Sequence, residues 1–373
     1  MRIALFCPSY GGVGGIETIA AALIREFERA GHTVTILARG NPVDSTPDAT
    51  VPVFRLPFHQ LPRRTRQVLS ELRFRRRLLQ VTAAFDRVLA AARSEVVLTL
   101  AVSTYAPYAA ALARHTPLVL SLQGGESRGQ FTSRPRALRR ALRRAARVVA
   151  CARSLATSAR TLDPQLASRL ILIPNGVDPD AFAAAPPRHH SRPYVAAVGR
   201  LVRQKGFDVL LDAFARVAKR DPPVDLLIAG DGAERAALLD ARDRLGIGER
   251  VQLIGTLDRD GVAALYRGAL FAVCPSRWEG LPVACLEAMA SGRAVVASAV
   301  DGVPDAVLPG ETGVLVPAED AGALSDAMTT LLADTALRER LGRRGEAIAR
   351  ERFAWSIVAG AYLAVLADAA AGR

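Results

Sequence analysis

Short apolar runs alternate along the chain with longer amphipathic segments. Runs of this kind are typical of strands buried on both faces of a parallel sheet, and the amphipathic segments are typical of the helices that cover it. Six strands are predicted in the first half, RIALFC, TVTILA, VVLTL, PLVLSL, ARVVAC and RLILIP, and six in the second, YVAAVG, VDLLIAG, RVQLIG, LFAVCP, RAVVAS and TGVLVP. The pattern therefore predicts two doubly wound α/β domains.

A proline-rich stretch without apolar periodicity, PNGVDPDAFAAAPPRHHSRPY, separates the two sets of strands. We expect a first domain at 1–177, a linker at 178–193 and a second domain at 194–351. The end of the chain is wholly helical, and residues 352–373 are expected to pack back on the first domain. Two such domains are expected to face each other across a cleft at the carboxyl ends of their strands, where ligands bind in such sheets.

The composition is that of a globular protein, with 373 residues, 50% hydrophobic and 23% charged. No run approaches the 18 apolar residues of a membrane span, and the opening MRIALFCPSY lacks the features of a signal peptide, so we expect a cytoplasmic protein. The four cysteines are widely spaced and lie mostly in apolar surroundings. Neither disulfides nor a zinc site is predicted.

The positive charge is concentrated in one half of the chain. Residues 1–180 hold 26 arginines and 12 acidic residues, a net charge of +14, mainly through Arg-rich segments at 61–80 and 134–149. In the second segment Leu138 and Leu142 recur at helical spacing among arginines, which predicts a basic amphipathic helix. Such a helix either binds an anionic membrane surface, at the inner face of the plasma membrane, or is simply solvated. Nucleic acid is not expected, because no aromatic residues are interleaved for base stacking.

A glycine-rich turn, CPSYGGVGGIE, follows the first predicted strand. Gly12 and Gly14 fit the dinucleotide-binding spacing, but Glu17 stands where a third glycine belongs. An NAD(P)-dependent oxidoreductase is thus a weaker alternative, and a purely structural turn is another.

Two cations, Arg200 and Lys205, follow the first strand of the second domain. The chain has only two lysines against 47 arginines, so a lysine at this position is a stronger signal than another arginine would be. The planar guanidinium of an arginine and the point charge of a lysine are both suited to binding a diphosphate. The alternative is that both side chains lie on a solvated loop and bind no ligand.

The segment RWEGLPVACLEAMASG carries Glu279 and Glu287, eight positions apart. Proline at 282 and glycine at 292 predict a helix over roughly 282–291, with Glu287 on the same stripe as Leu286. A carboxylate on that stripe needs hydrogen-bond donors, supplied either by an internal arginine or by a ligand diol. Glu279 is expected at the entrance of the same site.

These motifs, in this order, resemble the family 4 glycosyltransferases (glycosyl transferases group 1) of the retaining GT-B class. The resemblance includes PNGVD at 174–178 and GDG at 230–232 and covers essentially the whole chain. It implies a GT-B fold of two Rossmann-like domains, and transfer of a sugar from a nucleotide sugar to a lipid-linked, glycan or small-molecule hydroxyl, with retention and without a metal or other cofactor. A catalytically silent homologue is the remaining alternative.

The resemblance also implies roles for single residues. Arg200 and Lys205 would hold the diphosphate, Glu287 the ribose, and Glu279 would lie near the donor sugar. The implied donor-binding residues are Gly14, Gly15, Arg200, Lys205, Glu279, Gly280, Leu281 and Glu287, and the catalytic ones among them are Arg200, Lys205 and Glu279.

Gln123 and Asn175 are expected to contact the acceptor or the sugar. The family usually has His where this chain has Gln123, and a glutamine cannot carry a proton. The loop DGVPD places Asp301 and Asp305 where other members differ, which is expected to alter sugar or acceptor contacts.

Two Asp-x-Asp strings, at 178–180 and 258–260, precede helix-like runs. They are therefore interpreted as helix N-caps instead of metal ligands.

Overall fold

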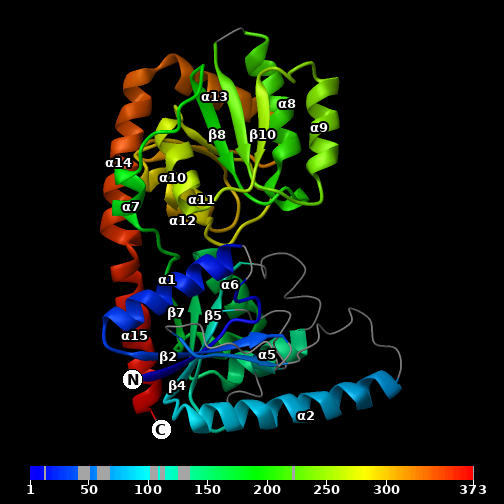
Figure 1. Cartoon of the computed structure of the whole chain (residues 1–373), viewed down its shortest axis with the longest axis vertical. Coiled ribbons are helices and arrows are strands. Elements are labelled where there is room, and N and C mark those ends of the chain that lie inside the picture. Colours follow the sequence, from blue (N-terminus) through cyan, green and yellow to red (C-terminus); the bar gives the residue numbers. More distant parts are fainter. Residues whose placement is uncertain are drawn as a thin grey trace. The chain divides into compact units, whose positions relative to one another are not determined.

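The structure is a computed structural model that describes residues 1–11, 14–40, 51–56, 68–100, 108–109, 114–124, 135–220 and 223–372. The chain forms two compact units. Unit 1 comprises Met1–Pro174 and Trp355–Arg373, and unit 2 comprises Asn175–Ala354. Each unit is a parallel sheet covered by helices (Figure 1), which confirms the predicted doubly wound α/β class. Gly12 lies outside the described residues.

The sheet of unit 1 has seven parallel strands in the order β3-β2-β1-β4-β5-β6-β7. The strands are β1 (Arg2–Phe6), β2 (Thr33–Arg39), β3 (Val53–Leu56), β4 (Val96–Thr99), β5 (Leu118–Leu122), β6 (Arg147–Ala150) and β7 (Leu170–Leu172). All six strands predicted here are present. The short edge strand β3 was not predicted, because VFRL is no continuous apolar run and is paired on one side only.

Helices cover this sheet on both faces, as parallel strands require. The helices are α1 (Gly15–Arg29), α2 (Val68–Ala91), α5 (Pro135–Arg144), α6 (Arg153–Leu162) and α15 (Trp355–Ala371). The last of these, α15, comes from the end of the chain and packs against α1, β4 and β5. Its Tyr362 side chain is fully buried, so the carboxyl-terminal helix is part of the core of unit 1.

The sheet of unit 2 has six parallel strands in the order β10-β9-β8-β11-β12-β13, and all six were predicted. They are β8 (Tyr194–Val198), β9 (Asp225–Ala229), β10 (Val251–Gly255), β11 (Ala272–Cys274), β12 (Val295–Ser298) and β13 (Gly313–Val316). The strand order reverses between the neighbours β8 and β11. The loops that leave their carboxyl ends are where doubly wound sheets bind ligands.

The helices of unit 2 include α13 and α14, two of the three long helices that make the end of the chain helical. They are α7 (Pro179–Ala184), α8 (Phe207–Ala218), α9 (Arg235–Arg244), α10 (Arg259–Gly268), α11 (Val283–Ala290), α12 (Val303–Ala306), α13 (Ala321–Ala333) and α14 (Thr335–Phe353). The buried core between α8, α13 and the sheet is built from Leu, Val, Ile and Phe side chains.

The segment expected to be a linker, 178–193, is instead folded within unit 2. Asp178 caps α7 by accepting a hydrogen bond from the Ala181 N–H at 3.2 Å, and Phe182 is buried. Asp258 caps α10 in the same way, with the Gly261 N–H at 2.8 Å. Both predicted N-caps are confirmed. The alanine-rich run after the Asp178 cap forms the expected short helix, but this helix is part of unit 2 and not of a linker.

Candidate functional site

Two loops at the carboxyl edge of the unit 2 sheet are joined along their main chains. One follows β8 and contains the 3-10 turn η3 (Arg203–Lys205), and the other follows β11. The Arg277 N–H donates to Gln204 O at 2.8 Å, and Gln204 Nε2 donates to Trp278 O at 3.0 Å. Gly206, at φ +65°, lies so close that a Cβ would be 2.1 Å from Pro275 O. Only glycine permits this approach of the two loops.

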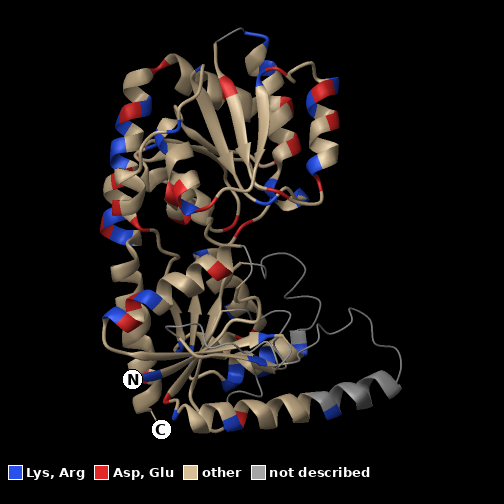
Figure 2. Ribbon diagram, in the orientation of Figure 1, with Lys and Arg blue, Asp and Glu red and all other residues tan. Residues whose placement is uncertain are grey.

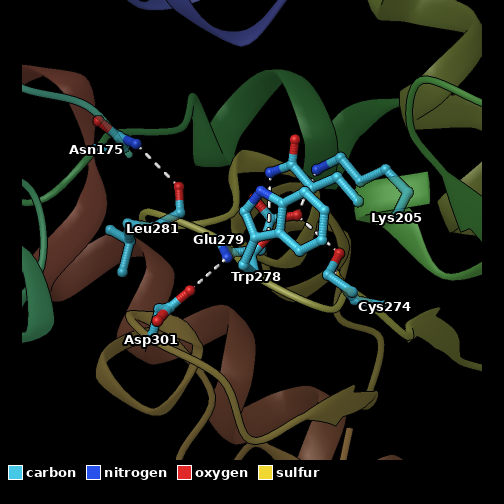
Figure 3. A network of polar contacts seen from close by, with 9 residues as sticks. Asn175, Lys205, Cys274, Trp278, Glu279, Leu281 and Asp301 are labelled. Carbon is cyan, nitrogen blue, oxygen red and sulfur yellow. Dashed lines mark hydrogen bonds and ion pairs between the residues drawn. The ribbon is translucent and has the colours of Figure 1, made fainter. Parts of the chain in front are cut away.

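The joined loops bring Lys205 and Glu279 into direct contact (Figure 3). The Lys205 ammonium forms an ion pair with Glu279 Oε1, and Ser276 Oγ donates to the same oxygen at 2.7 Å. Burial alone would lower the pKa of Lys205, but the Glu279 carboxylate raises it above its ordinary value. The cation and the acid predicted as separate contacts are therefore one ion pair, with Glu279 only 6% exposed.

The main chain around Glu279 is held by two polar side chains from other elements (Figure 3). The Glu279 N–H donates to Asp301 Oδ2 at 3.0 Å, and Asn175 Nδ2 donates to Leu281 O at 2.9 Å. Asp301 adopts φ +43°, in the left-handed region. Asn175 is buried, and its Oδ1 has no hydrogen-bond partner among the described residues. In this structure both side chains support the loop, whereas the sequence pointed to contacts with a ligand.

Glu287 lies on α11, whose bounds agree with the predicted helix within a residue at each end. The side chain is half-buried, and among the described residues its carboxylate has no hydrogen-bond partner and no ion pair. Burial raises its pKa to about 7, while Arg259 and Lys205 act in the opposite direction from a distance. The internal arginine considered for this carboxylate is therefore not in contact with it, and its oxygens remain available to a donor from a ligand.

Three more residues singled out from the sequence lie on the same two loops, and Gly230 lies beside one of them. Arg200 is exposed, and its side chain bonds to none of the described residues. Gly280 and Leu281 are buried just before α11, and their N–H groups have no partner in the part of the chain that the structure describes. Gly230, at φ +137°, passes so close to the loop after β8 that a Cβ would lie 1.9 Å from Gly199 O.

Arg277 is central to this region and was not singled out from the sequence. Its guanidinium donates to both carboxylate oxygens of Asp208 at 2.8 and 2.7 Å, to Glu319 Oε1 at 2.8 Å and to Arg203 O at 2.9 Å. Its side chain is 11% exposed, and Asp208 raises its pKa above the ordinary value. Arg277 thus ties the loop after β11 to η3, to the start of α8 and to the loop before α13.

The residues of unit 1 singled out from the sequence lie near the carboxyl ends of β1 and β5. Gly15 begins α1, and Gly14 caps it, with its carbonyl accepting from the Thr18 N–H at 3.1 Å and Oγ1 at 3.0 Å. Gln123 directly follows β5, where Nε2 donates to Ser121 Oγ at 2.8 Å.

Helix α5 has the predicted amphipathic character (Figure 2). Its buried face consists of Leu138, Ala141 and Leu142. The arginines described on its exposed face are Arg136, Arg139, Arg140, Arg143 and Arg144. Arg143 pairs with Asp163 at 2.6 Å. In the other Arg-rich segment, residues 61–67 lie outside the described residues, as do most side chains up to 80.

Metal-binding clusters and membrane-spanning helices were also sought in the described ranges. No group of three or more His, Cys, Asp or Glu side chains there is arranged to hold a metal ion. None of the helices described is both long enough and apolar enough to cross a membrane. All four cysteines are buried, and none of them takes part in a disulfide within the described residues.

Comparison with known families covers both halves of the chain. Residues 13–181 match the family described as Glycosyltransferase Family 4, and residues 180–348 match Glycosyl transferases group 1. The phosphatidyl-myo-inositol mannosyltransferase of Mycobacterium leprae (strain TN) is 31% identical over 370 residues, which are 96% of this chain and 94% of that protein. The D-inositol 3-phosphate glycosyltransferase of Corynebacterium efficiens is 35% identical over 171 residues, or 44% of this chain and 40% of that protein.

Solved structures share the fold at lower identity. A sucrose-phosphate synthase from Thermosynechococcus elongatus superposes with a TM-score of 0.82 at 24% identity, covering 100% of both chains. HepE of Anabaena, in complex with UDP and glucose, superposes with a TM-score of 0.78 at 22% identity, covering 98% of this chain and 99% of that one.

Proposed function

Since the chain belongs to the family 4 glycosyltransferases, we propose that it moves a sugar from a nucleoside diphosphate sugar to a hydroxyl of a lipid-linked or glycan acceptor. The reaction proposed retains the anomeric configuration and needs no metal, and it serves cell-surface polysaccharide or glycolipid synthesis. One observation carries the proposal: the buried Lys205–Glu279 ion pair lies on the loops that lead into α11, and α11 carries Glu287, a carboxylate without a partner among the described residues.

The diphosphate is proposed to bind at the cationic side of these loops. An ammonium has three N–H donors, and Glu279 takes one from Lys205, so two are left for phosphate oxygens. Arg200 adds a planar fork, and the N–H groups of Gly280 and Leu281 add donors at the start of a helix. Negative charge develops on the diphosphate as the anomeric bond breaks, and donors fixed in advance stabilise that charge without reorganising.

The ribose is proposed to bind Glu287, whose carboxylate accepts hydrogen bonds from the two ribose hydroxyls. A carboxylate that has lost much of its hydration and has no donors is unfavourable, and the raised pKa of Glu287, about 7, reflects this. A ribose diol supplies two donors at once and stabilises the ionised form. Glu279, whose Oε1 is already bound by Lys205 and Ser276, is assigned to the donor sugar.

The acceptor hydroxyl is proposed to attack from the leaving-group side and to pass its proton to the departing phosphate. This route gives retention without a covalent intermediate on the enzyme. Gln123 is assigned to a sugar hydroxyl in this step, and because an amide does not titrate, it binds without exchanging a proton.

We propose that the enzyme binds to an anionic membrane surface and acts there. The exposed arginines of α5 support it, since cations near an anionic surface contribute about 1 kcal/mol each. A relative of the chain is named a phosphatidyl-myo-inositol mannosyltransferase, and a lipid-linked acceptor would favour a peripheral enzyme.

A donor screen tests the proposal. UDP-glucose, GDP-mannose and ADP-glucose are incubated with the protein in EDTA, with NADH as a non-sugar control, and nucleotide release is measured. We expect one sugar nucleotide to be consumed in EDTA and to stabilise the protein thermally, and a retained anomeric configuration in the product by NMR. Binding without turnover would indicate a silent homologue, an inverted product would overturn the mechanism, and activity that needs added Mg²⁺ would overturn metal independence.

A further inference from the structure

Three polar side chains of unit 1 form a closed triangle beside β5. Ser121 Oγ and the Tyr362 hydroxyl are 2.8 Å apart, Gln123 Nε2 lies 2.8 Å from Ser121 Oγ, and it lies 3.2 Å from the Tyr362 hydroxyl. Ser121 and Tyr362 are both buried, and Tyr362 is delivered by α15 from the far end of the chain. The triangle therefore joins the sheet to the carboxyl-terminal helix at the residue that departs from the family pattern.

The number of hydrogens decides which way the Gln123 amide points. With Nε2 in the triangle, the amide donates to Ser121 Oγ and, at the longer distance, to the Tyr362 hydroxyl, one hydroxyl hydrogen lies between the two oxygens, and the other hydroxyl hydrogen points out of the triangle. With Oε1 there instead, three oxygens would share only two hydroxyl hydrogens, and one close O···O contact would have no hydrogen between its atoms. Such a contact is repulsive, so Ser121 and Tyr362 hold the amide with Nε2 inward.

This orientation leaves Gln123 Oε1 without a hydrogen-bond partner among the described residues, and the atom is buried. A buried carbonyl oxygen without a donor is unfavourable, and it can only accept. The residue directly follows β5 at the carboxyl edge of the sheet, where ligands bind.

We propose that Tyr362 and Ser121 are positioning residues that hold Gln123 as a one-way acceptor, so that the enzyme recognises a sugar hydroxyl by accepting its hydrogen at Oε1. This inference rests on the function proposed above and deepens it. It assigns a direction to the hydrogen bond at Gln123 and gives the carboxyl-terminal helix a part in sugar recognition. The hydroxyl belongs either to the donor sugar or to the acceptor.

The test measures kcat/KM for wild type and the variants Gln123→Ala, Gln123→Glu, Tyr362→Phe and Gln123→Ala/Tyr362→Phe. Substrates are UDP-glucose and GDP-mannose, each with its monodeoxy analogues, without acceptor and with phosphatidylinositol vesicles. Tyr194→Phe is the matched control, because it also removes a buried, hydrogen-bonded hydroxyl. The Tyr194 hydroxyl donates to Leu265 O at 2.8 Å, and Tyr194 lies at the amino end of β8, away from the carboxyl edge of the sheet. Thermal unfolding of each variant separates folding defects from altered recognition.

We expect Gln123→Ala to lower kcat/KM about tenfold and to abolish the enzyme's discrimination against one deoxy analogue. An effect in the acceptor-free arm assigns the hydroxyl to the donor sugar, and an effect only with vesicles assigns it to the acceptor. Gln123→Glu keeps an accepting oxygen and should retain part of the discrimination.

Tyr362→Phe should lower kcat/KM about threefold and reduce the discrimination, yet add nothing in the Gln123→Ala background. An unchanged deoxy discrimination in Gln123→Ala, or additive effects of the two substitutions, would overturn the inference. Failure of the wild type to consume any sugar nucleotide would instead overturn the proposed function, so the two failures are distinguishable.

Discussion

The carboxyl edges of the two sheets differ in the kind of polar group that they present. In unit 2 the groups are charged and joined to one another, as in the Lys205–Glu279 pair and the Arg277–Asp208 fork. In unit 1 the corresponding triangle of Ser121, Gln123 and Tyr362 is neutral. Charged groups fixed in place are suited to a diphosphate, and neutral groups are suited to hydroxyls. The difference supports the proposal that unit 2 binds the leaving group and that unit 1 binds a hydroxyl.

The strongest way to break this comparison is to remove the cation of unit 2. Lys205→Ala should lower turnover at least tenfold, about 1.4 kcal/mol in the barrier, because the departing diphosphate loses a donor. The chain's second lysine, Lys219, is exposed at the end of α8, so Lys219→Ala is a matched control with no expected effect. Normal turnover in the Lys205 variant would remove this residue from the proposed phosphate site.

The pH dependence of nucleotide binding tests the acid of unit 2. The pKa of Glu287 is raised to about 7, so the carboxylate that accepts the ribose hydrogens forms as pH rises through that value. The Kd for the preferred nucleotide should therefore fall about tenfold between about pH 6 and pH 8. Glu287→Gln should bind weakly with a flat profile, and Glu339→Gln, an exposed control on α14, should keep the slope of the wild type.

The same carboxylate makes a prediction about folding. A carboxyl whose pKa is higher in the folded state than in the unfolded chain holds its proton more tightly when folded. The stabilisation is present below the unfolded pKa, near 4.5, and is lost as pH rises through about 7. The Tm of the ligand-free protein should fall over this range, and less so in Glu287→Gln. A wild-type Tm that rises there more than in the variant would contradict the assignment.

Removing Arg277 sharpens the comparison, because this residue is proposed to hold the charged groups without touching the ligand. Arg277→Ala should lower turnover roughly fivefold and destabilise the fold by about 2 kcal/mol, since it leaves the Asp208 carboxylate without its partner. Arg277→Lys keeps the charge but loses the fork, and should recover stability better than turnover. Arg343→Ala, on the surface of α14, is the control. A loss of stability with normal turnover would make Arg277 purely structural.

The smallest effect is expected at the membrane surface. Arg140→Gln, on the exposed face of α5, removes one cation and should weaken binding to phosphatidylglycerol vesicles about fivefold, or roughly 1 kcal/mol. Flotation measures this, with phosphatidylcholine vesicles and Arg343→Gln as controls. Wild-type protein that fails to float, or floats equally at high salt, would remove the membrane from the proposal.

Most strands could be predicted because strands buried on both faces of a parallel sheet consist of short, continuous apolar runs. Twelve predicted runs became strands, while β3 was missed because it is an edge strand of four residues with an exposed Phe54. Helix α7 (Pro179–Ala184) was placed in a linker at 178–193 because prolines were taken as a domain boundary, although Asp178 had been identified as a cap. Local signals predicted local structure well.

The site was predictable only where its residues are close in sequence. The helix that carries Glu287 followed from Pro282 and Gly292, and the place of Glu287 on its inward stripe followed from helical spacing, whereas the choice between an internal arginine and a ligand as its partner stayed open. The Lys205–Glu279 contact spans 74 positions and the Arg277–Asp208 fork spans 69, and no local pattern reports such pairs. Because the chain has 47 arginines, the presence of an arginine at 277 did not by itself mark that position as part of the site.

The glycines under the unit 2 loops have a consequence for redesign. Gly206 and Gly230 pack directly against the main chain of neighbouring loops. A Cβ at Gly206 would lie 2.1 Å from Pro275 O, and a Cβ at Gly230 would lie 1.9 Å from Gly199 O. Libraries meant to change the sugar nucleotide preference should leave these two codons untouched, since every substitution there displaces the backbone. Diversity is better placed at Trp278, which joins the loops through its main-chain carbonyl and not through its side chain.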